Sequence, residues 1–343
     1  MKKILVLTDN FGPQTGGAYA AVSSTVYQLA KNGLDIKLVY FKDSISNRSR
    51  DLFTLIKNAE IVHFFGAWTW VHVKTMIISI LLRKKTVITP MGAFEEWSLS
   101  QKKFKKKLAL FVYQKYFLKK STLVHCTSEG EESNIKKINK QIKTVVLRHG
   151  LEGTEYKKVK IFNKKRRKML FFSRIHQKKG ISDVIKAWTY LKPKGWELDI
   201  IGPAGDNTIN VIKKKIIQTK LNRKIFLKKP IFIPREKKEL FKQYDVSILY
   251  SKNENFGYSI LESLKHSLPV ITTNNTPWKK IKTYNAGWYI NYDFEALIKT
   301  LNKVFKIRNK ELLLKSKNAF RLSKIYNWNK IIPEYIKMYK KLN

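Results

Sequence analysis

Two glutamates stand eight positions apart in the segment Glu254-Asn-Phe-Gly-Tyr-Ser-Ile-Leu-Glu262, with a Phe-Gly pair between them. The segment leads from an apolar strand pattern into a helical one, and open α/β sheets bind ligands at such turns. Gly257 allows a ligand to approach the backbone closely, and the first amides of a helix attract phosphate. An ionised glutamate accepts hydrogen bonds from neighbouring hydroxyls. The spacing therefore favours a ligand with phosphates and hydroxyls; the alternative is a surface acid followed by an ordinary capped helix.

A Gly-rich turn, Gly12-Pro-Gln-Thr-Gly-Gly17, follows the first predicted strand. It lacks the G-x-G-x-x-G spacing of dinucleotide-binding turns, and it lacks the Gly-Lys-Ser or Gly-Lys-Thr of a phosphate loop. A nicotinamide-dependent enzyme and a nucleotide hydrolase are therefore disfavoured. Gly16 and Gly17 still let the backbone approach a phosphate or a sugar closely, and an ordinary tight turn is the alternative.

Strand and helix patterns alternate in two series, separated by a predicted linker near 150–168 that includes a run of Lys and Arg. The predicted strands cover residues 3–8, 36–41, 60–65, 86–89, 122–126, 169–173, 196–201, 224–227, 246–250 and 269–272. The predicted helices cover residues 18–32, 69–82, 102–119, 129–138, 182–191, 208–220, 259–266, 294–305 and 310–324. Such alternation predicts parallel sheets covered by helices. The fold class is α/β, with two Rossmann-like, doubly wound domains that face a cleft suited to a large two-part substrate.

The composition is that of a globular protein, because 343 residues with 43% hydrophobic content suffice for two packed domains. The single cysteine, Cys126, excludes an intrachain disulfide and a cysteine-rich zinc site. No apolar run reaches the roughly 18 to 20 residues of a membrane-spanning helix, and the N-terminal apolar run is too short for a signal peptide. We therefore expect a cytoplasmic protein.

The formal net charge of +44 raises the question of a nucleic-acid partner. Lysine greatly outnumbers arginine, however, and arginine is the side chain that recognises phosphate in bidentate geometry. The basic residues are spread over the whole chain, without a helix-turn-helix, zinc-finger or RNA-binding aromatic pattern. The sequence therefore predicts no specific nucleic-acid partner.

Lysines and large apolar residues alternate on a helical pattern from Lys102 to Lys120. A basic amphipathic helix of this kind suits an anionic membrane surface, and several lysines together can hold a peripheral protein there. In the alternative interpretation, Leu108, Phe111 and Val112 face the domain core and the lysines cover the outer side.

Taken together, these segments resemble the retaining glycosyltransferases of the GT-B architecture, family 4, especially those that build bacterial surface polysaccharides. The resemblance runs almost end to end and includes Phe172-Ser-Arg-Ile-His-Gln-Lys-Lys-Gly180, the turn Ile201-Gly-Pro-Ala-Gly205 and the segment with the two glutamates. It implies that Arg174 and Lys179 hold the donor diphosphate, as two cations suit such a leaving group. It implies further that Glu254 contacts the donor sugar and Glu262 the ribose. The catalytic residues so implied are Arg174, Lys179 and Glu254, and the donor-binding residues are Gly16, Gly17, Gly202, Phe256, Gly257, Tyr258, Ser259, Ile260 and Glu262.

On the acceptor side the resemblance includes departures. Val62-His-Phe-Phe-Gly-Ala-Trp68 is similar to a His-x-His-Gly-x-Trp element, but Phe65 replaces the second His. Thr89-Pro-Met-Gly-Ala-Phe-Glu-Glu-Trp97 is similar to a Pro-Arg-Gly-x-x-Glu-Pro-Trp loop, but Met91 replaces the Arg and Glu96 the Pro. The acceptor-side candidates are His63, Trp68, Met91, Gly92, Glu95 and Trp97. The alternatives are a packed strand residue for His63 and a solvated loop for the second segment.

The resemblance implies transfer of a sugar from a nucleoside diphosphate sugar to a hydroxyl of a glycan or lipid-linked glycan, with retention of configuration. It implies no cofactor and no metal, and a role in lipopolysaccharide, capsule or other surface-polysaccharide synthesis, with the protein cytoplasmic or peripheral on the inner membrane face. The expected domains are an acceptor-side domain at 1–160, a nucleotide-sugar-binding domain at 161–325, and a C-terminal helix at 326–343 that can pack back on the first domain. Two alternatives stay open: a sugar-nucleotide epimerase of the same architecture, and a non-catalytic polyanion-binding protein.

Overall fold

The computed structural model describes residues 3–9, 11–41, 49–152 and 166–342. The chain forms two compact units: residues 1–152 with 328–343, and residues 153–327. The predicted linker and the predicted boundary at residues 160 and 161 lie largely outside the described residues. In the described parts, no helix is long and apolar enough to cross a membrane.

The first unit is built on a six-stranded parallel sheet with the strand order β2-β1-β3-β4-β5-β6. Its strands are β1 (Lys3–Asp9), β2 (Asp35–Phe41), β3 (Ile61–Phe65), β4 (Lys85–Thr89), β5 (Leu123–Cys126) and β6 (Thr144–Val146). Its helices are α1 (Gly17–Lys31), α2 (Ser49–Lys57), α3 (Trp70–Leu81), α4 (Glu96–Ser100), α5 (Lys103–Ala109), α6 (Lys115–Lys120), α7 (Glu129–Ile138) and α15 (Trp328–Lys340). A π-helical turn, η3 (Leu110–Gln114), joins α5 to α6, and a 3-10 turn, η1 (Pro13–Thr15), precedes α1.

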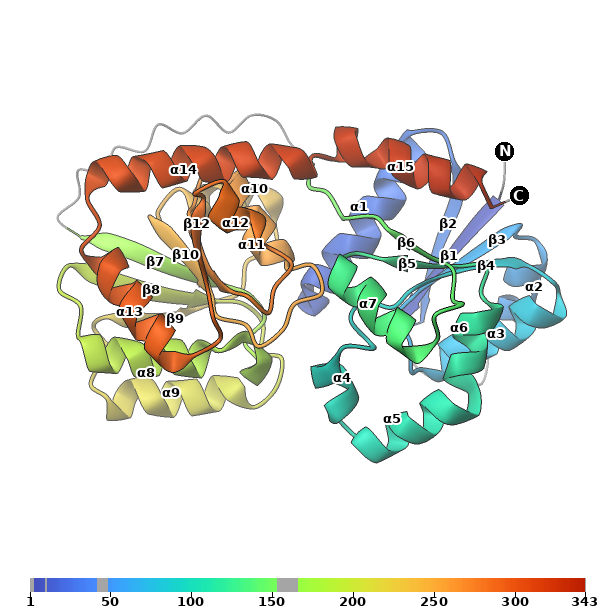
Figure 1. Cartoon of the computed structure of the whole chain (residues 1–343), viewed down its shortest axis with the longest axis horizontal. Helices are drawn as coiled ribbons and strands as arrows, with labels where there is room; N and C mark the ends of the chain where they lie inside the picture. The colour runs from blue at the N-terminus through green and yellow to red at the C-terminus, as the bar shows by residue number, and fades with distance from the viewer. Residues whose placement is uncertain (1–2, 10, 42–48, 153–165, 343) are drawn as a thin grey trace. The chain divides into compact units, whose positions relative to one another are not determined.

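Helices cover both faces of this sheet because strand β1 is apolar at successive positions, which point to opposite faces. Ile4 and Val6 belong to the apolar cluster that also takes in residues of α1 and α15. Leu5 and Leu7 belong to a second cluster, with residues of α2 and α3. The C-terminal helix α15 therefore packs on α1 and completes the core of the first unit (Figure 1).

The second unit repeats the plan with a parallel sheet of strand order β12-β11-β10-β7-β8-β9. Its strands are β7 (Arg167–Phe172), β8 (Trp196–Ile201), β9 (Ile225–Lys228), β10 (Val246–Leu249), β11 (Val270–Thr273) and β12 (Gly287–Ile290). Its helices are α8 (Ile181–Leu191), α9 (Thr208–Gln218), α10 (Pro234–Phe241), α11 (Tyr258–Lys265), α12 (Lys280–Thr283), α13 (Phe294–Phe305) and α14 (Asn309–Ser323), with 3-10 turns η4 (Gln177–Lys179) and η5 (Lys324–Tyr326). Helices α8, α9 and α13 lie on one face of the sheet, and α10, α11, α12 and α14 lie on the other (Figure 1).

The strand order reverses once in each sheet: between β1 and β3 in the first unit, and between β7 and β10 in the second. At such a point the loops after neighbouring strands turn to opposite faces, which opens a crevice at the carboxyl ends of the strands. The predicted α/β fold with two doubly wound parallel sheets is confirmed. Short elements that the sequence did not predict are α2, α4, α10, α12, β6 and β12.

Candidate active site

The reversal point of the second sheet is formed by the segments that follow β7 and β10. After β7, the chain turns through Arg174 to η4, and Ile175 bridges to Ala204 after β8. Two glycines let these segments approach. A Cβ on Gly180 would lie 1.8 Å from the carbonyl oxygen of Tyr250, and a Cβ on Gly202 would lie 1.9 Å from that of Ser173. Gly180 also has a φ of +69°, which favours glycine. The close packing places η4 directly beside the residues that follow β10.

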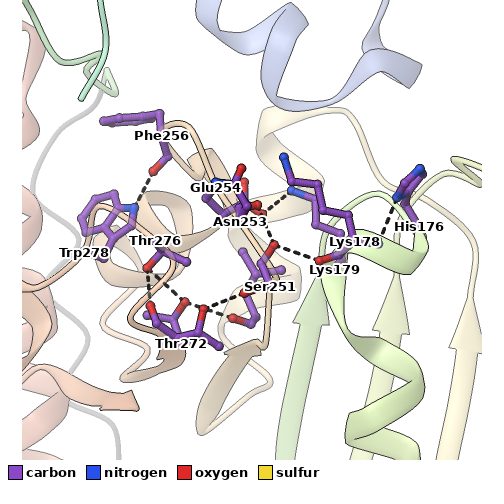
Figure 2. Close-up of polar contacts among 12 residues, drawn as sticks. His176, Lys178, Lys179, Ser251, Asn253, Glu254, Phe256, Thr272, Thr276 and Trp278 are labelled. Carbon is purple, nitrogen blue, oxygen red and sulfur yellow. Dashed lines mark hydrogen bonds and ion pairs between the residues drawn. The ribbon is translucent and has the colours of Figure 1, made fainter. Parts of the chain in front are cut away.

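Lys179 and Glu254 form an ion pair at this point, with Nζ 2.5 Å from Oε1 (Figure 2). Burial alone would raise the pKa of Glu254, but the charges of Lys179 and Lys178, with hydrogen bonds from Lys179 and Ser251, outweigh burial and lower this pKa. The Ser251 hydroxyl also donates to the carbonyl oxygen of Lys178 at 3.1 Å, and the Lys252 amide donates to the same oxygen at 2.8 Å. The structure therefore holds Glu254 ionised, with a cation against it.

Trp278 contacts the turn between the two glutamates and holds it in place. Its indole Nε1 donates to the carbonyl oxygen of Phe256 at 2.5 Å, and their rings lie 5.7 Å apart (Figure 2). Gly257 has a φ of +81° and is the N-cap of α11, so that Tyr258, Ser259 and Ile260 form the first turn of the helix. The first amides of a helix carry the positive end of its dipole, and in this turn the Ile260 amide donates to the Gly257 carbonyl oxygen at 3.0 Å. This helix start is suited to an anion.

Glu262 lies one turn further along α11 and is paired with a residue of a different helix. Lys237 of α10 places Nζ 2.8 Å from Glu262 Oε1 and 5.4 Å from the centre of the Phe172 ring, at the end of β7. Both side chains of the ion pair are largely buried. Lys237 therefore orients Glu262 toward the same edge of the sheet.

Arg174 and Gly202 lie at this edge as well. Arg174 is exposed, and its aliphatic stem packs over Gly205, where a Cβ would lie 2.8 Å from Arg174 Cγ. Nearby, His176 accepts a hydrogen bond from the Lys178 amide and lies 3.5 Å from Asp206, which supports the turn. The structure thus brings together Arg174, Lys179, Gly202, Glu254 and Glu262, five of the residues that the sequence assigned to the donor.

The reversal point of the first sheet contains a cavity of about 150 Å³. Residues from β1, β3, α1 and the segment after β4 line it, among them Asp9, Phe11, Tyr19, Gly66 and Met91. Asp9 Oδ2 accepts a hydrogen bond from the Thr69 hydroxyl at 2.6 Å, and Thr69 in turn accepts one from the His72 amide as the N-cap of α3. Burial raises the pKa of Asp9, and the hydrogen bond from Thr69 only partly offsets this. The cavity combines a carboxylate with aromatic rings, a combination suited to a sugar.

The loop that follows β4 borders this cavity. Glu131 of α7 accepts a hydrogen bond from the Gly92 amide at 2.7 Å, and the indole of Trp68 donates to the carbonyl oxygen of Ala93 at 3.0 Å. Met91 has a φ of +58° and Trp68 a φ of +70°, unusual values for residues with a side chain. These contacts hold a strained loop in one conformation, as is common at binding sites.

The other acceptor-side candidates differ in exposure. His63 is fully buried; its Nδ1 lies 2.5 Å from the Tyr339 hydroxyl and its Nε2 lies 2.7 Å from the Thr89 hydroxyl. Glu95 is buried as the N-cap of α4, whereas Trp97 is partly exposed. Gly16 and Gly17, which the sequence assigned to the donor, belong to the first unit and not to the edge of the second sheet. Gly16, with a φ of +64°, is the N-cap of α1 and Gly17 is its first residue, in the turn that leads into the helix lining the cavity.

Sequence reasoning did not single out Asp9, Thr69 or Lys237. Asp9 directly ends an apolar strand, and that position was a usable signal. Lys237 carried no signal, because one more lysine on a lysine-rich helix is unremarkable until the fold places it against Glu262. In the described parts of the chain, no group of three or more His, Cys, Asp or Glu side chains is placed to hold a metal ion.

The model of the family "Glycosyl transferases group 1" matches residues 152–320, and therefore nearly all of the second unit. No curated protein matches the sequence. Among solved structures, sucrose-phosphate synthase from Thermosynechococcus elongatus is 15% identical over 99% of both chains, with a TM-score of 0.79. HepE from Anabaena, in complex with UDP and glucose, is 14% identical over 99% of this chain and 100% of its own, with a TM-score of 0.78. WaaG, a glycosyltransferase of lipopolysaccharide biosynthesis, is 14% identical over 98% and 99%, with a TM-score of 0.74. These likenesses show that the chain has the two-domain GT-B fold.

Proposed function

We propose that the protein transfers a sugar from a nucleoside diphosphate sugar to a hydroxyl with retention of configuration, because its second unit matches the family model of glycosyl transferases group 1. The observation that carries this proposal is the edge of the second sheet, where the Lys179–Glu254 pair, Arg174 and the start of α11 surround one reversal point. The acceptor is a glycan or a lipid-linked glycan of a surface polysaccharide. Two of the similar structures support the class of donor and product: HepE was solved with UDP and glucose, and WaaG acts in lipopolysaccharide biosynthesis.

The chemistry follows from the charges at this edge. As the sugar–phosphate bond breaks, negative charge grows on the diphosphate and positive charge on the sugar ring. Arg174, Lys179 and the amides at the start of α11 stabilise the departing diphosphate. Lys179 has three N–H donors, so it can donate to the diphosphate and still hold Glu254. No metal is required, because these groups supply the positive charge.

Glu254 and Glu262 act as hydrogen-bond acceptors for the donor rather than as an acid and a base. The lowered pKa of Glu254 makes it a poor proton acceptor but keeps it charged, and a charged carboxylate binds sugar hydroxyls strongly. Glu262, oriented by Lys237, binds the ribose hydroxyls. The leaving phosphate itself takes the proton of the acceptor hydroxyl on the same face of the sugar, which gives retention.

The test is a panel of nucleotide sugars, with UDP-glucose among them, first for thermal stabilisation and then for release of nucleoside diphosphate with EDTA present. We expect at least one donor to be cleaved. Glu254→Gln should lower that rate at least about a hundredfold, and Glu239→Gln, a change at an exposed glutamate of the same unit, should leave it unaltered. Equal rates for wild type and Glu254→Gln would contradict the assignment, and conversion of the donor sugar without transfer would indicate an epimerase.

A further inference from the structure

The helical segment from α5 through η3 to α6 presents large apolar side chains to solvent. Phe104, Leu108, Phe111 and Val112 are exposed to 83%, 56%, 86% and 64%. Their spacing of four, three and one residues places them on one side of the helix. Figure 1 shows α5 at the margin of the first unit, away from its sheet. The alternative interpretation of the sequence, in which Leu108, Phe111 and Val112 face the domain core, is therefore wrong.

The same segment fills the core with a different set of side chains. Phe117 and Leu118 are buried, and Leu110 and Tyr113 pack against the same apolar cluster. Gln114, also buried, faces His72 of α3 at 3.1 Å. The exposed residues thus form a second apolar side of this helical segment, and this side is not part of the core of the unit. We call Phe104, Leu108, Phe111 and Val112 the outer apolar face.

Lysines surround the outer apolar face. Residues 101–120 contain eight lysines and no acidic residue. Within the described residues, none of these lysines forms an ion pair with a carboxylate of the protein, although Lys106 donates to Ser98. Their charges therefore remain available to an external anion. A nucleic acid would use the charge but not four exposed apolar side chains, whereas an anionic bilayer uses both.

We propose that the outer apolar face docks on an anionic lipid bilayer, with Phe104 and Phe111 inserted among the acyl chains and the lysines at the level of the headgroups. Apolar insertion and lysine attraction act together in such helices, and each alone gives weak binding. The docking surface belongs to the first unit, and its test does not depend on the proposed transfer reaction. If the acceptor is lipid-linked, docking brings the enzyme to the surface where the acceptor lies.

The chain offers a matched control in the second unit. Helix α9 also exposes two large apolar residues, Val211 at 51% and Ile217 at 72%, beside a run of lysines. The experiment is co-sedimentation of the full chain with vesicles of phosphatidylcholine and phosphatidylglycerol at 150 mM salt. Phe104→Ser/Phe111→Ser should lower the partition coefficient of the protein between water and vesicles at least about tenfold. Val211→Ser/Ile217→Ser should leave this coefficient within about twofold of the wild-type value. All four side chains are exposed, so both variants should fold, which circular dichroism checks.

A second readout reports insertion directly. The only cysteine, Cys126, is buried, so a polarity-sensitive dye can be attached selectively to Phe111→Cys or, as control, to Ile217→Cys. Emission should shift to the blue with anionic vesicles at position 111 and stay unchanged at position 217. Equal vesicle binding by both double variants would overturn the proposal. The proposal would also be overturned if the wild type did not bind vesicles but formed a dimer that Phe104→Ser/Phe111→Ser converts to a monomer. Binding of the wild type to single-stranded nucleic acid in place of vesicles would overturn it as well.

Discussion

Replacing Lys179 with Met should destabilise the second unit by about 3–5 kcal/mol, the usual cost of removing one partner of a buried ion pair. The pair belongs to the buried class, because the side chains of Lys179 and Glu254 are only 14% and 8% exposed, with Nζ and Oε1 2.5 Å apart. An exposed pair would contribute at most about 1 kcal/mol. Adding Glu254→Gln removes the uncompensated carboxylate. The double variant should therefore be more stable than Lys179→Met by about 1–3 kcal/mol, the usual cost of leaving a buried polar group without its partner.

The destabilisation should also depend on pH. In the wild type the pKa of Glu254 lies below its ordinary value of 4.5, so the pair contributes stability above that pH and loses it as the pH falls. Without Lys179, burial becomes the stronger influence and raises the pKa of Glu254, so the folded variant binds a proton before the unfolded chain does. The difference in stability between the two proteins should be largest near neutral pH and should narrow toward pH 4.

Native-state hydrogen exchange of the amides in β7 and β10 is the appropriate assay, because it reports the second unit separately in a two-unit chain. Lys242→Met serves as control, because it breaks the surface pair with Glu239 on the same unit and should cost less than about 1 kcal/mol. Donor cleavage is measured in parallel and should be lost in both Lys179→Met and the double variant. If Lys179→Met had wild-type stability at pH 7, or if the double variant were the less stable of the two, the reasoning about the buried pair would be refuted.

Three further predictions rest on single contacts. Burial lowers the pKa of His125 from 6.5 to about 4, so the folded protein keeps this side chain neutral. About 3 kcal/mol of folding stability should therefore be lost as the pH falls from 6.5 to 4. In acid denaturation curves, His125→Gln should lose correspondingly less stability over this range. Gly180→Ala should destabilise the second unit by more than about 3 kcal/mol in the hydrogen-exchange assay, because its Cβ would lie 1.8 Å from a backbone oxygen. Gly16 has a similar φ but open space around its Cβ, so Gly16→Ala should destabilise the first unit by only about 1 kcal/mol. Under the proposed reaction Glu262 binds the ribose and does not touch the reacting bond. Lys237→Met, which removes the ion-pair partner of Glu262, should therefore raise the donor KM about tenfold and leave kcat within about twofold. Steady-state kinetics decide this, and a drop in kcat alone would contradict it.

Periodicity predicted most of the fold because the apolar residues of the central strands repeat with little interruption. Strand β7 and helix α13, for example, have apolar patterns that are visible without any tertiary information. The missed elements are short or polar. Helix α10 is mostly charged and exposed, and its two buried residues, Leu240 and Phe241, fall at its end, so no helical repeat could be read from it. Strand β12 lies at the sheet edge with a Gly at its start, where strand propensity is weak.

The candidate site was predictable where its residues share one local segment. Gly257, the start of α11 and the two glutamates lie within nine residues, so their spacing alone pointed to a phosphate and to hydroxyls. The partners of the glutamates were not predictable in the same way. The resemblance singled out Lys179 for the diphosphate, not for Glu254, and Lys237 pairs with Glu262 only because α10 packs beside α11. Such contacts depend on how the crossover helices are placed, which sequence spacing does not encode.

The two reversal points carry carboxylates of opposite character, and this difference follows from their neighbours. Asp9 has a neutral partner, the Thr69 hydroxyl, and burial raises its pKa; Glu254 has a cationic partner, Lys179, and its pKa is lowered. A carboxylate with raised pKa holds a proton more readily and suits an exchange of hydrogen bonds with a neutral hydroxyl. A carboxylate pinned in the charged form beside a lysine suits a site where a diphosphate brings its own charge, because the lysine keeps the two anions from repelling one another. Under the proposed reaction, this division assigns the neutral acceptor hydroxyl to the first unit and the anionic donor to the second.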